Sequence, residues 1–117
     1  MTDGLTLSVL QRDAYDIAVA RGQWPRDCRA PAAVPSMLAM LARRAIGEET
    51  TELTAALSRL GASGSLDPVA DELADVVIVA ASIAEALGVD LEQAVAHKMR
   101  RNEERAQAEG GRRRCVG

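Results

Sequence analysis

Large aromatic side chains are almost absent from this chain of 117 residues, which has one Trp, one Tyr and no Phe. Its hydrophobic core must therefore be built from Leu, Val, Ile, Met and many Ala residues. Small and aliphatic side chains suit closely approaching helices better than the strands of a β-sandwich. We expect an all-α fold.

Cysteines and long apolar runs are also scarce. The two cysteines, Cys28 and Cys115, lack the spacing of a disulfide framework or of a metal site, so we expect free thiols. The longest purely apolar stretch, residues 76–81, is far too short to span a bilayer, and we expect no signal segment because the first residues lack a charged region leading into a long apolar run. We expect no membrane association and a cytoplasmic location.

The formal net charge of -3 argues against general nucleic-acid binding, and we expect no nucleic-acid partner. Positive charge is concentrated near the end of the chain, from Arg112 to Arg114. We expect one domain over residues 1–109, followed by a flexible basic tail over residues 110–117.

Apolar periodicity and capping residues predict four helices, over residues 7–21, 35–60, 68–87 and 91–108. The expected N-caps are Thr6, Asp67 and Asp90, and the expected stops are Gly22, Gly61 and Gly88. In the first helix the predicted buried stripe is Leu7, Leu10, Ala14 and Ile17. The segment between the first two helices contains several prolines and is predicted to be an irregular crossing loop.

The third helix is apolar around most of its circumference. Between residues 73 and 87 the polar exceptions are Asp75, Ser82 and Glu85. One partner helix cannot cover such a surface, so we expect this helix also to pack across a subunit interface in a homodimer or homotetramer.

Two clusters of acids interrupt these apolar helices. Glu48-Glu49-x-x-Glu52 lies in the second helix, and Glu72-x-x-Asp75 lies in the third. Residues three or four apart share one helix face, so each cluster projects a pair of carboxylates toward one region. Buried carboxylates need compensation, and oxygen ligands in this arrangement suit Mg²⁺, with Mn²⁺ as a possible substitute.

These motifs resemble the pattern E-E-x-x-E, a variable gap and E-x-x-D of the MazG-like, all-α nucleoside triphosphate pyrophosphohydrolases. The downstream segment with Lys98, Asn102 and Arg105 is also similar to that family, and the likeness extends over residues 7–105. The resemblance implies a four-helix MazG-like bundle. It also implies hydrolysis of a (deoxy)nucleoside triphosphate to the monophosphate and pyrophosphate, in the house-cleaning of nucleotide pools.

The resemblance assigns roles to individual residues. It implies that Mg²⁺ is bound by Glu49, Glu52, Glu72 and Asp75. Glu48, about 100° around the helix from Glu49, could activate the attacking water, help to bind a second metal, or simply pair with Arg44 in solvent.

Substrate contacts are expected from the fourth helix and from the loop after the first. Lys98, Asn102 and Arg105 could bind the triphosphate, although such a charged segment is also typical of an exposed helix end. Trp24 could stack on the base or serve as a hydrophobic cap on the bundle. His97 is assigned no role, because no second His or Cys lies at metal-site spacing.

Two other functions remain open from the sequence. One is a phosphoribosyl-ATP pyrophosphohydrolase, which has the same acidic pattern. The other is a non-catalytic helical oligomerisation module that binds a metal or a nucleotide. A di-iron bundle is disfavoured, because the chain lacks Glu-x-x-His motifs.

Overall fold

The computed structural model describes residues 4–24 and 35–116, with side chains described for residues 4–24 and 36–110. Its helices are α1 (Leu7–Ala20), α2 (Pro35–Ser63), α3 (Asp67–Leu87) and α4 (Leu91–Val116), and these ranges contain no strand. The prediction of an all-α, four-helix chain is confirmed. Residues 25–34, which make up most of the predicted crossing loop and include Cys28, lie outside the described residues, as does the side chain of Cys115.

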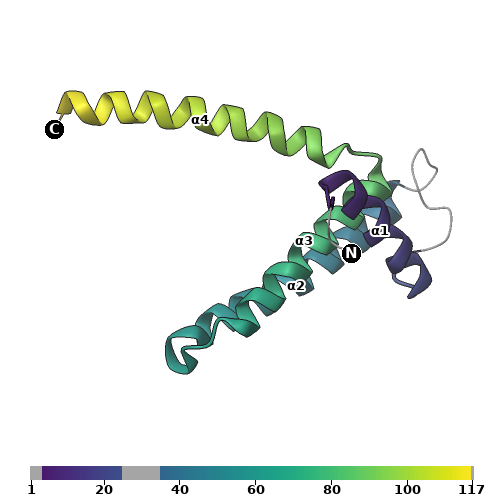
Figure 1. Cartoon of the computed structure of the whole chain (residues 1–117). Coiled ribbons are helices and arrows are strands. Elements are labelled where there is room, and N and C mark those ends of the chain that lie inside the picture. Colours follow the sequence, from purple (N-terminus) through teal and green to yellow (C-terminus); the bar gives the residue numbers. More distant parts are fainter. Residues whose placement is uncertain (1–3, 25–34, 117) are drawn as a thin grey trace.

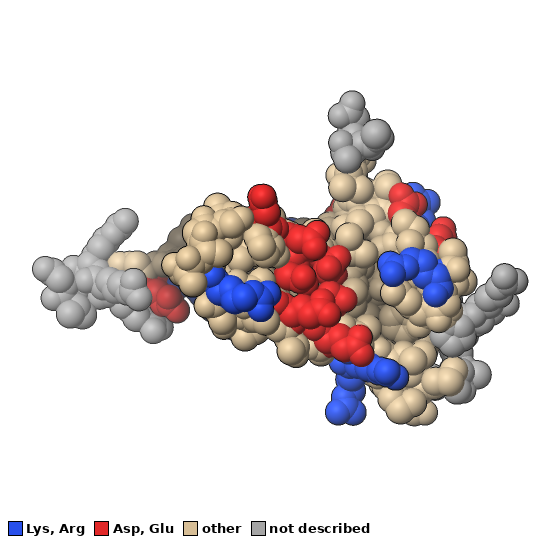
Figure 2. Space-filling model, turned by 90° about the horizontal axis from the view of Figure 1, so that it is seen from below, with Lys and Arg blue, Asp and Glu red and all other residues tan. Residues whose placement is uncertain are grey.

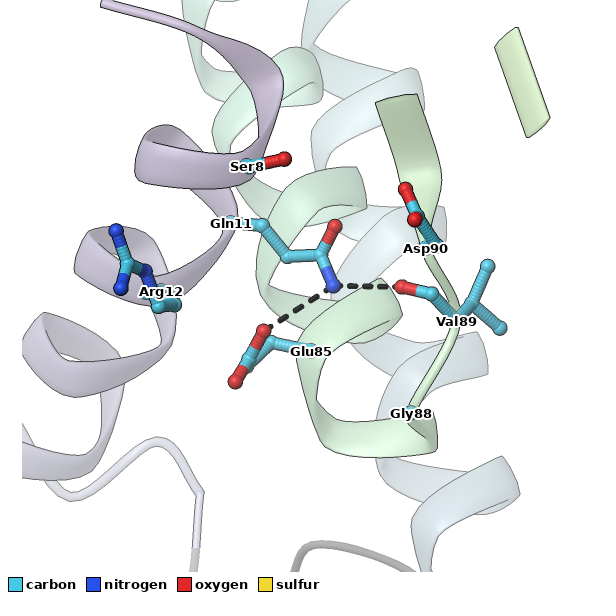
Figure 3. A pocket seen from close by; sticks show the side chains of 7 residues that line it. All are labelled: Ser8, Gln11, Arg12, Glu85, Gly88, Val89 and Asp90. Carbon is cyan, nitrogen blue, oxygen red and sulfur yellow. Dashed lines mark hydrogen bonds between the residues drawn. The ribbon is translucent and has the colours of Figure 1, made fainter. Parts of the chain in front are cut away.

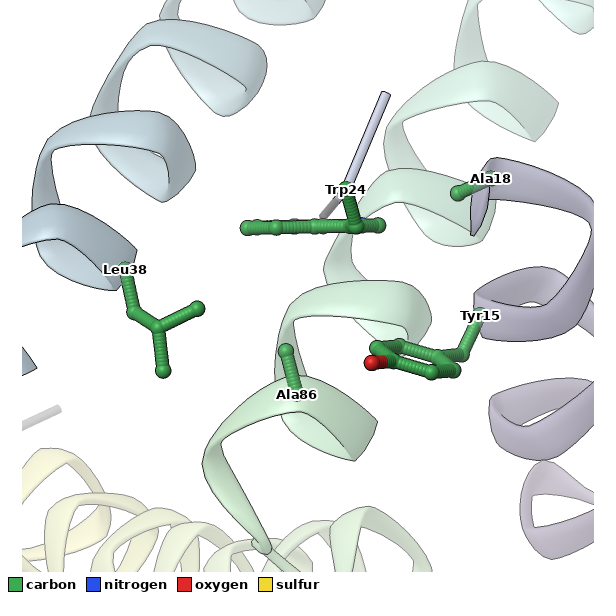
Figure 4. Close-up of a cluster of buried hydrophobic side chains, with 5 residues drawn as sticks. All are labelled: Tyr15, Ala18, Trp24, Leu38 and Ala86. Carbon is green, nitrogen blue, oxygen red and sulfur yellow. The ribbon is translucent and has the colours of Figure 1, made fainter. Parts of the chain in front are cut away.

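Helices α2 and α3 form an antiparallel hairpin, and α1 packs against α3 near the open end of that hairpin (Figure 1). A small buried cluster joins the three helices there and contains Tyr15, Ala18, Trp24, Leu38 and Ala86 (Figure 4). Helix α4 meets the rest of the chain chiefly at α1 and projects away from the hairpin (Figure 1). Within one chain, α4 therefore does not lie alongside the other three helices.

The helix ends follow the predicted caps in most places. Thr6 Oγ1 accepts a hydrogen bond from the Val9 amide at 3.2 Å, and Asp90 Oδ1 accepts one from the Gln93 amide at 3.0 Å. Gly22 and Gly88 adopt φ values of +78° and +74°, which glycine tolerates and which end α1 and α3. These four predictions are confirmed.

The other two predictions, of a helix stop at Gly61 and a cap at Asp67, are wrong. Helix α2 continues through Gly61 to Ser63 and ends before Gly64, which has a φ of +69°. A glycine inside a helix only lowers its stability, whereas a left-handed residue ends it. Asp67 is the first residue of α3 rather than its cap, and the preceding Leu66 provides no side-chain cap.

The buried face of α1 also differs from the predicted stripe. The buried residues are Gln11, Ala14, Tyr15 and Ala18, whereas Ile17 is 58% exposed. Burial follows the position of α3 rather than the hydropathy of each residue, so a polar glutamine occupies the interface.

Helix α4 is longer than predicted, because it continues through the expected tail as far as Val116. No helix in the described part of the chain is long and apolar enough to cross a membrane.

Candidate metal centre

Four carboxylates from the two arms of the hairpin converge on one point. Glu49 and Glu52 lie one turn apart on α2, and Glu72 and Asp75 lie one turn apart on α3. One ligand oxygen from each residue lies within 4.8 Å of the other three. Figure 2 shows acidic side chains gathered into one patch on this face. The structure thus brings together all four residues predicted to bind the metal.

The spacing and chemistry of these oxygens fit a small hard cation. Ligands on opposite sides of an octahedral Mg²⁺ lie about 4.2 Å apart, because each Mg–O distance is about 2.1 Å. The observed spread of 4.8 Å is only slightly wider. In addition, Glu49 Oε2 and Glu72 Oε2 are buried and have no hydrogen-bond partner, so each can donate a lone pair to an ion.

Crowding of these carboxylates raises two pKa values. The pKa of Glu49 lies above its ordinary value, first because burial disfavours the charged form and then because Glu52, Asp75 and the other acids add negative charge nearby. The pKa of Glu72 is raised for the same reasons, with a further contribution from a side-chain hydrogen bond with Glu52. Both raised pKa values reflect burial and the repulsion between neighbouring carboxylates, and a bound cation would relieve that repulsion.

A pocket of about 380 Å³ lies beside this cluster, between α2, α3 and the end of α1. Glu48, Glu49 and Trp24 are among the residues that line it. Glu48 Oε1 accepts a hydrogen bond from Arg44 Nε at 3.3 Å, and the two side chains are 62% and 80% exposed. The predicted Arg44 pairing therefore exists, and Glu48 still lies directly next to Glu49.

Trp24 is mainly a core residue. Only 5% of its surface is exposed, and it lies between Leu38 on one side and Ala18 with Tyr15 on the other (Figure 4). Its indole N–H donates to Ser82 Oγ at 3.3 Å, and the Ser82 hydroxyl donates to the Val79 carbonyl at 2.9 Å. Packing and this hydrogen bond thus fix the position of the ring where it borders the pocket.

The remaining predicted substrate residues lie elsewhere. Lys98, Asn102 and Arg105 are exposed on α4, which projects away from the acidic cluster (Figure 1). One chain does not bring them to the four carboxylates. His97 is likewise exposed on α4.

A sequence model of the MazG-like family matches residues 40–114, which include both acidic motifs. The chain belongs to the MazG-like family. Searches of curated proteins and of solved structures found no significant match.

The MazG-like motifs did not reveal every residue of this site. The sequence marks Ser82 only as a polar residue in an otherwise apolar helix. A polar residue in such a place needs a hydrogen-bond partner, and this is the signal that points to its bond with Trp24. The sequence indicates Arg44 only as an ion-pair partner of nearby acids such as Glu48, because its place in the pocket depends on Trp24, twenty residues away in the sequence.

Proposed function

We propose that this MazG-like protein is a Mg²⁺-dependent nucleoside triphosphate pyrophosphohydrolase with a house-cleaning role. The observation that best supports the proposal is the convergence of four carboxylates, two of which have a buried oxygen without a hydrogen-bond partner. A triphosphate is shielded from nucleophiles by its own negative charge, so its hydrolysis requires neutralisation by cations. An acidic cluster beside a pocket offers a place where a metal and a nucleotide can meet.

In this proposal Glu49, Glu52, Glu72 and Asp75 hold the metal. When bound, Mg²⁺ supplies charge neutralisation at the phosphates and polarises their P–O bonds. The four carboxylates fix its position at the junction of α2 and α3, and the nucleoside occupies the pocket bordered by Trp24.

Glu48 is the proposed general base. It accepts a proton from a water molecule whose oxygen attacks the α-phosphorus, and the bond from that phosphorus to the bridging oxygen breaks. Pyrophosphate leaves with the bridging oxygen, and the monophosphate retains the oxygen from water. The position of Glu48 beside Glu49 and in the same pocket supports this role.

We further propose that the protein works as a homodimer or homotetramer. Several large apolar side chains of α3 are exposed, including Leu73 and Val77. Lys98, Asn102 and Arg105 bind the phosphates in this proposal, and assembly with a second copy offers a route to an acidic cluster that they do not reach within one chain.

The test is pyrophosphate release from a panel of ribonucleoside and deoxynucleoside triphosphates and phosphoribosyl-ATP, with Mg²⁺ and with EDTA. We expect release only with the metal, and we expect Glu49→Gln and Asp75→Asn each to lower kcat/KM by at least about 100-fold. Asp71→Asn is the matched control, because Asp71 is an exposed acid next to Glu72 but outside the four ligands. Metal binding without any release would instead favour a non-catalytic module.

A further inference from the structure

Arg44 occupies a distinctive position in the pocket beside the acidic cluster. It is the only cationic side chain among the described residues that line this pocket, and Glu48 and Glu49 line the same pocket. Neighbouring Arg43, by contrast, is exposed on α2 and does not line it. Two adjacent arginines therefore differ in whether they can contact a ligand.

The chemistry of the pocket walls sets the orientation of a nucleotide. One part of the lining is apolar and includes Leu41, Val79 and Trp24, whereas Glu49 belongs to the metal cluster. If the base and sugar lie against the apolar part and the phosphates point toward the acids that would hold the metal, the phosphate nearest the sugar lies between the two, in a pocket that Arg44 also lines.

The interaction that Arg44 makes without ligand is a weak one. Its Nε donates to Glu48 Oε1 at 3.3 Å, and both side chains are largely exposed. Exposed ion pairs contribute little to stability, because water and salt screen them. A phosphate that accepts two parallel hydrogen bonds from the guanidinium is a stronger partner than Glu48, which accepts one from Nε.

We propose that Arg44 binds the phosphate next to the nucleoside and exchanges Glu48 for that phosphate when substrate enters. The inference rests on the proposed function. The exchange couples binding to catalysis, because it releases the Glu48 carboxylate beside Glu49 at the moment when the attacking water must lose a proton. Arg44 is thereby a substrate-contacting residue, and the phosphate it binds is the one retained in the monophosphate product.

The experiment compares the affinities of monophosphates and of the corresponding nucleosides in the presence of Mg²⁺. The probes are dAMP, dCMP, dGMP, dTMP and dUMP, each with its deoxynucleoside. Binding is followed by the fluorescence of Trp24, the sole tryptophan of the chain, and by titration calorimetry in parallel. Arg44→Ala is compared with Arg44→Lys and with Arg43→Ala as the matched control.

We expect the wild type to bind its preferred monophosphate more tightly than the nucleoside. Arg44→Ala should weaken monophosphate binding by about ten- to a hundred-fold and leave nucleoside binding unchanged. Arg44→Lys should restore part of the lost affinity, because lysine keeps the positive charge but cannot donate two parallel hydrogen bonds. Arg43→Ala should bind both ligands like the wild type. Circular dichroism of each variant establishes that it is folded.

Three results would overturn the inference. The first is equal affinity of the wild type for monophosphate and nucleoside. The second is an Arg44→Ala variant in which the difference between these two affinities is the same as in the wild type. The third is an equal loss of monophosphate affinity in Arg44→Ala and Arg43→Ala. Pyrophosphate release by the wild type separates the two proposals. If release is observed alongside any of these results, only the role of Arg44 fails, whereas absence of release removes the proposed function as well.

Discussion

At the residue scale, the acidic cluster makes the metal-free protein less stable at neutral pH. The pKa values of Glu49 and Glu72 are raised above their ordinary value of 4.5. Between pH 4.5 and the raised values, the folded chain binds more protons than the unfolded chain, so the free energy of unfolding falls as pH rises through that window. Well below pH 4.5 both carboxyl groups are protonated in the folded and the unfolded chain, so they no longer lower the free energy of unfolding.

Glu49→Gln should therefore stabilise the metal-free protein while removing its response to metal. In EDTA at pH 7, we expect the variant to melt a few degrees above the wild type, and we expect a smaller decrease in stability as pH rises from 4.5 to 7. At a Mg²⁺ concentration one hundred times its Kd, the free energy of unfolding of the wild type should rise by about 2.7 kcal/mol, and that of the variant should rise much less.

Thermal melts across this pH range, with EDTA and with Mg²⁺, measure both effects. Glu92→Gln is the control, because Glu92 is an exposed acid on α4 outside the cluster. A Glu49→Gln variant that is less stable than the wild type in EDTA, yet equally stabilised by Mg²⁺, would contradict the metal assignment.

The sequence predicted the residues of the cluster because their positions depend on local geometry and on one hairpin. Glu49 with Glu52, and Glu72 with Asp75, are paired by helix periodicity alone. The contacts of Trp24 were not predictable in the same way, because its bond to Ser82 joins residues 58 positions apart. The composition of the pocket depends on such long-range contacts.

At the scale of elements, the corner between α3 and α4 is held by one buried side chain of α1, Gln11 (Figure 3). Its Nε2 donates to Glu85 Oε1 at 3.1 Å and to the Val89 carbonyl at 2.6 Å. Its Oε1 accepts from the Leu91 amide, the first residue of α4, at 3.1 Å. Gln11 thus joins three helices and fixes the direction in which α4 leaves.

Gln11→Ala should loosen this corner. Loss of the amide removes the hydrogen bonds that Gln11 makes to the Val89 carbonyl and the Leu91 amide, so we expect a decrease of about 1–3 kcal/mol in the free energy of unfolding. Urea denaturation measures the decrease, and hydrogen exchange should become faster at the Leu91 amide in particular. Gln93→Ala removes an exposed glutamine from α4 and should change stability by less than about 0.5 kcal/mol. Equal stability of the two variants would show that Gln11 does not hold the corner.

Helix existence was predictable from periodicity, whereas the buried faces and some ends were not. Ile17 has the hydropathy of a core residue but lies on the face of α1 that α3 does not cover. Gly61 has the usual chemistry of a helix stop, yet the backbone becomes left-handed only at Gly64. Both outcomes depend on how the helices pack against one another, which the pattern of residues along the sequence does not specify.

At the scale of the whole molecule, the chain is too extended for a compact monomer. Its radius of gyration is 17.8 Å, whereas a compact chain of this length has a radius of about 13 Å. Much of the excess comes from α4, on which Val95 and Met99 are 41% and 62% exposed. On α3, Leu73 and Val77 are 49% and 48% exposed. A second copy packed against these surfaces would cover them and would make the assembly more compact for its mass than one chain alone.

Val77→Glu should weaken that assembly, because burial of an unpaired carboxylate among apolar side chains is unfavourable. Light scattering after size exclusion should give the wild type the mass of a dimer or tetramer and give Val77→Glu a lower mass at the same concentration. Ser58→Glu introduces the same charge at an exposed polar position of α2 and should retain the wild-type mass. A wild type with the mass of one chain, and a radius of gyration near 17.8 Å by X-ray scattering, would show that the exposed faces remain uncovered in solution.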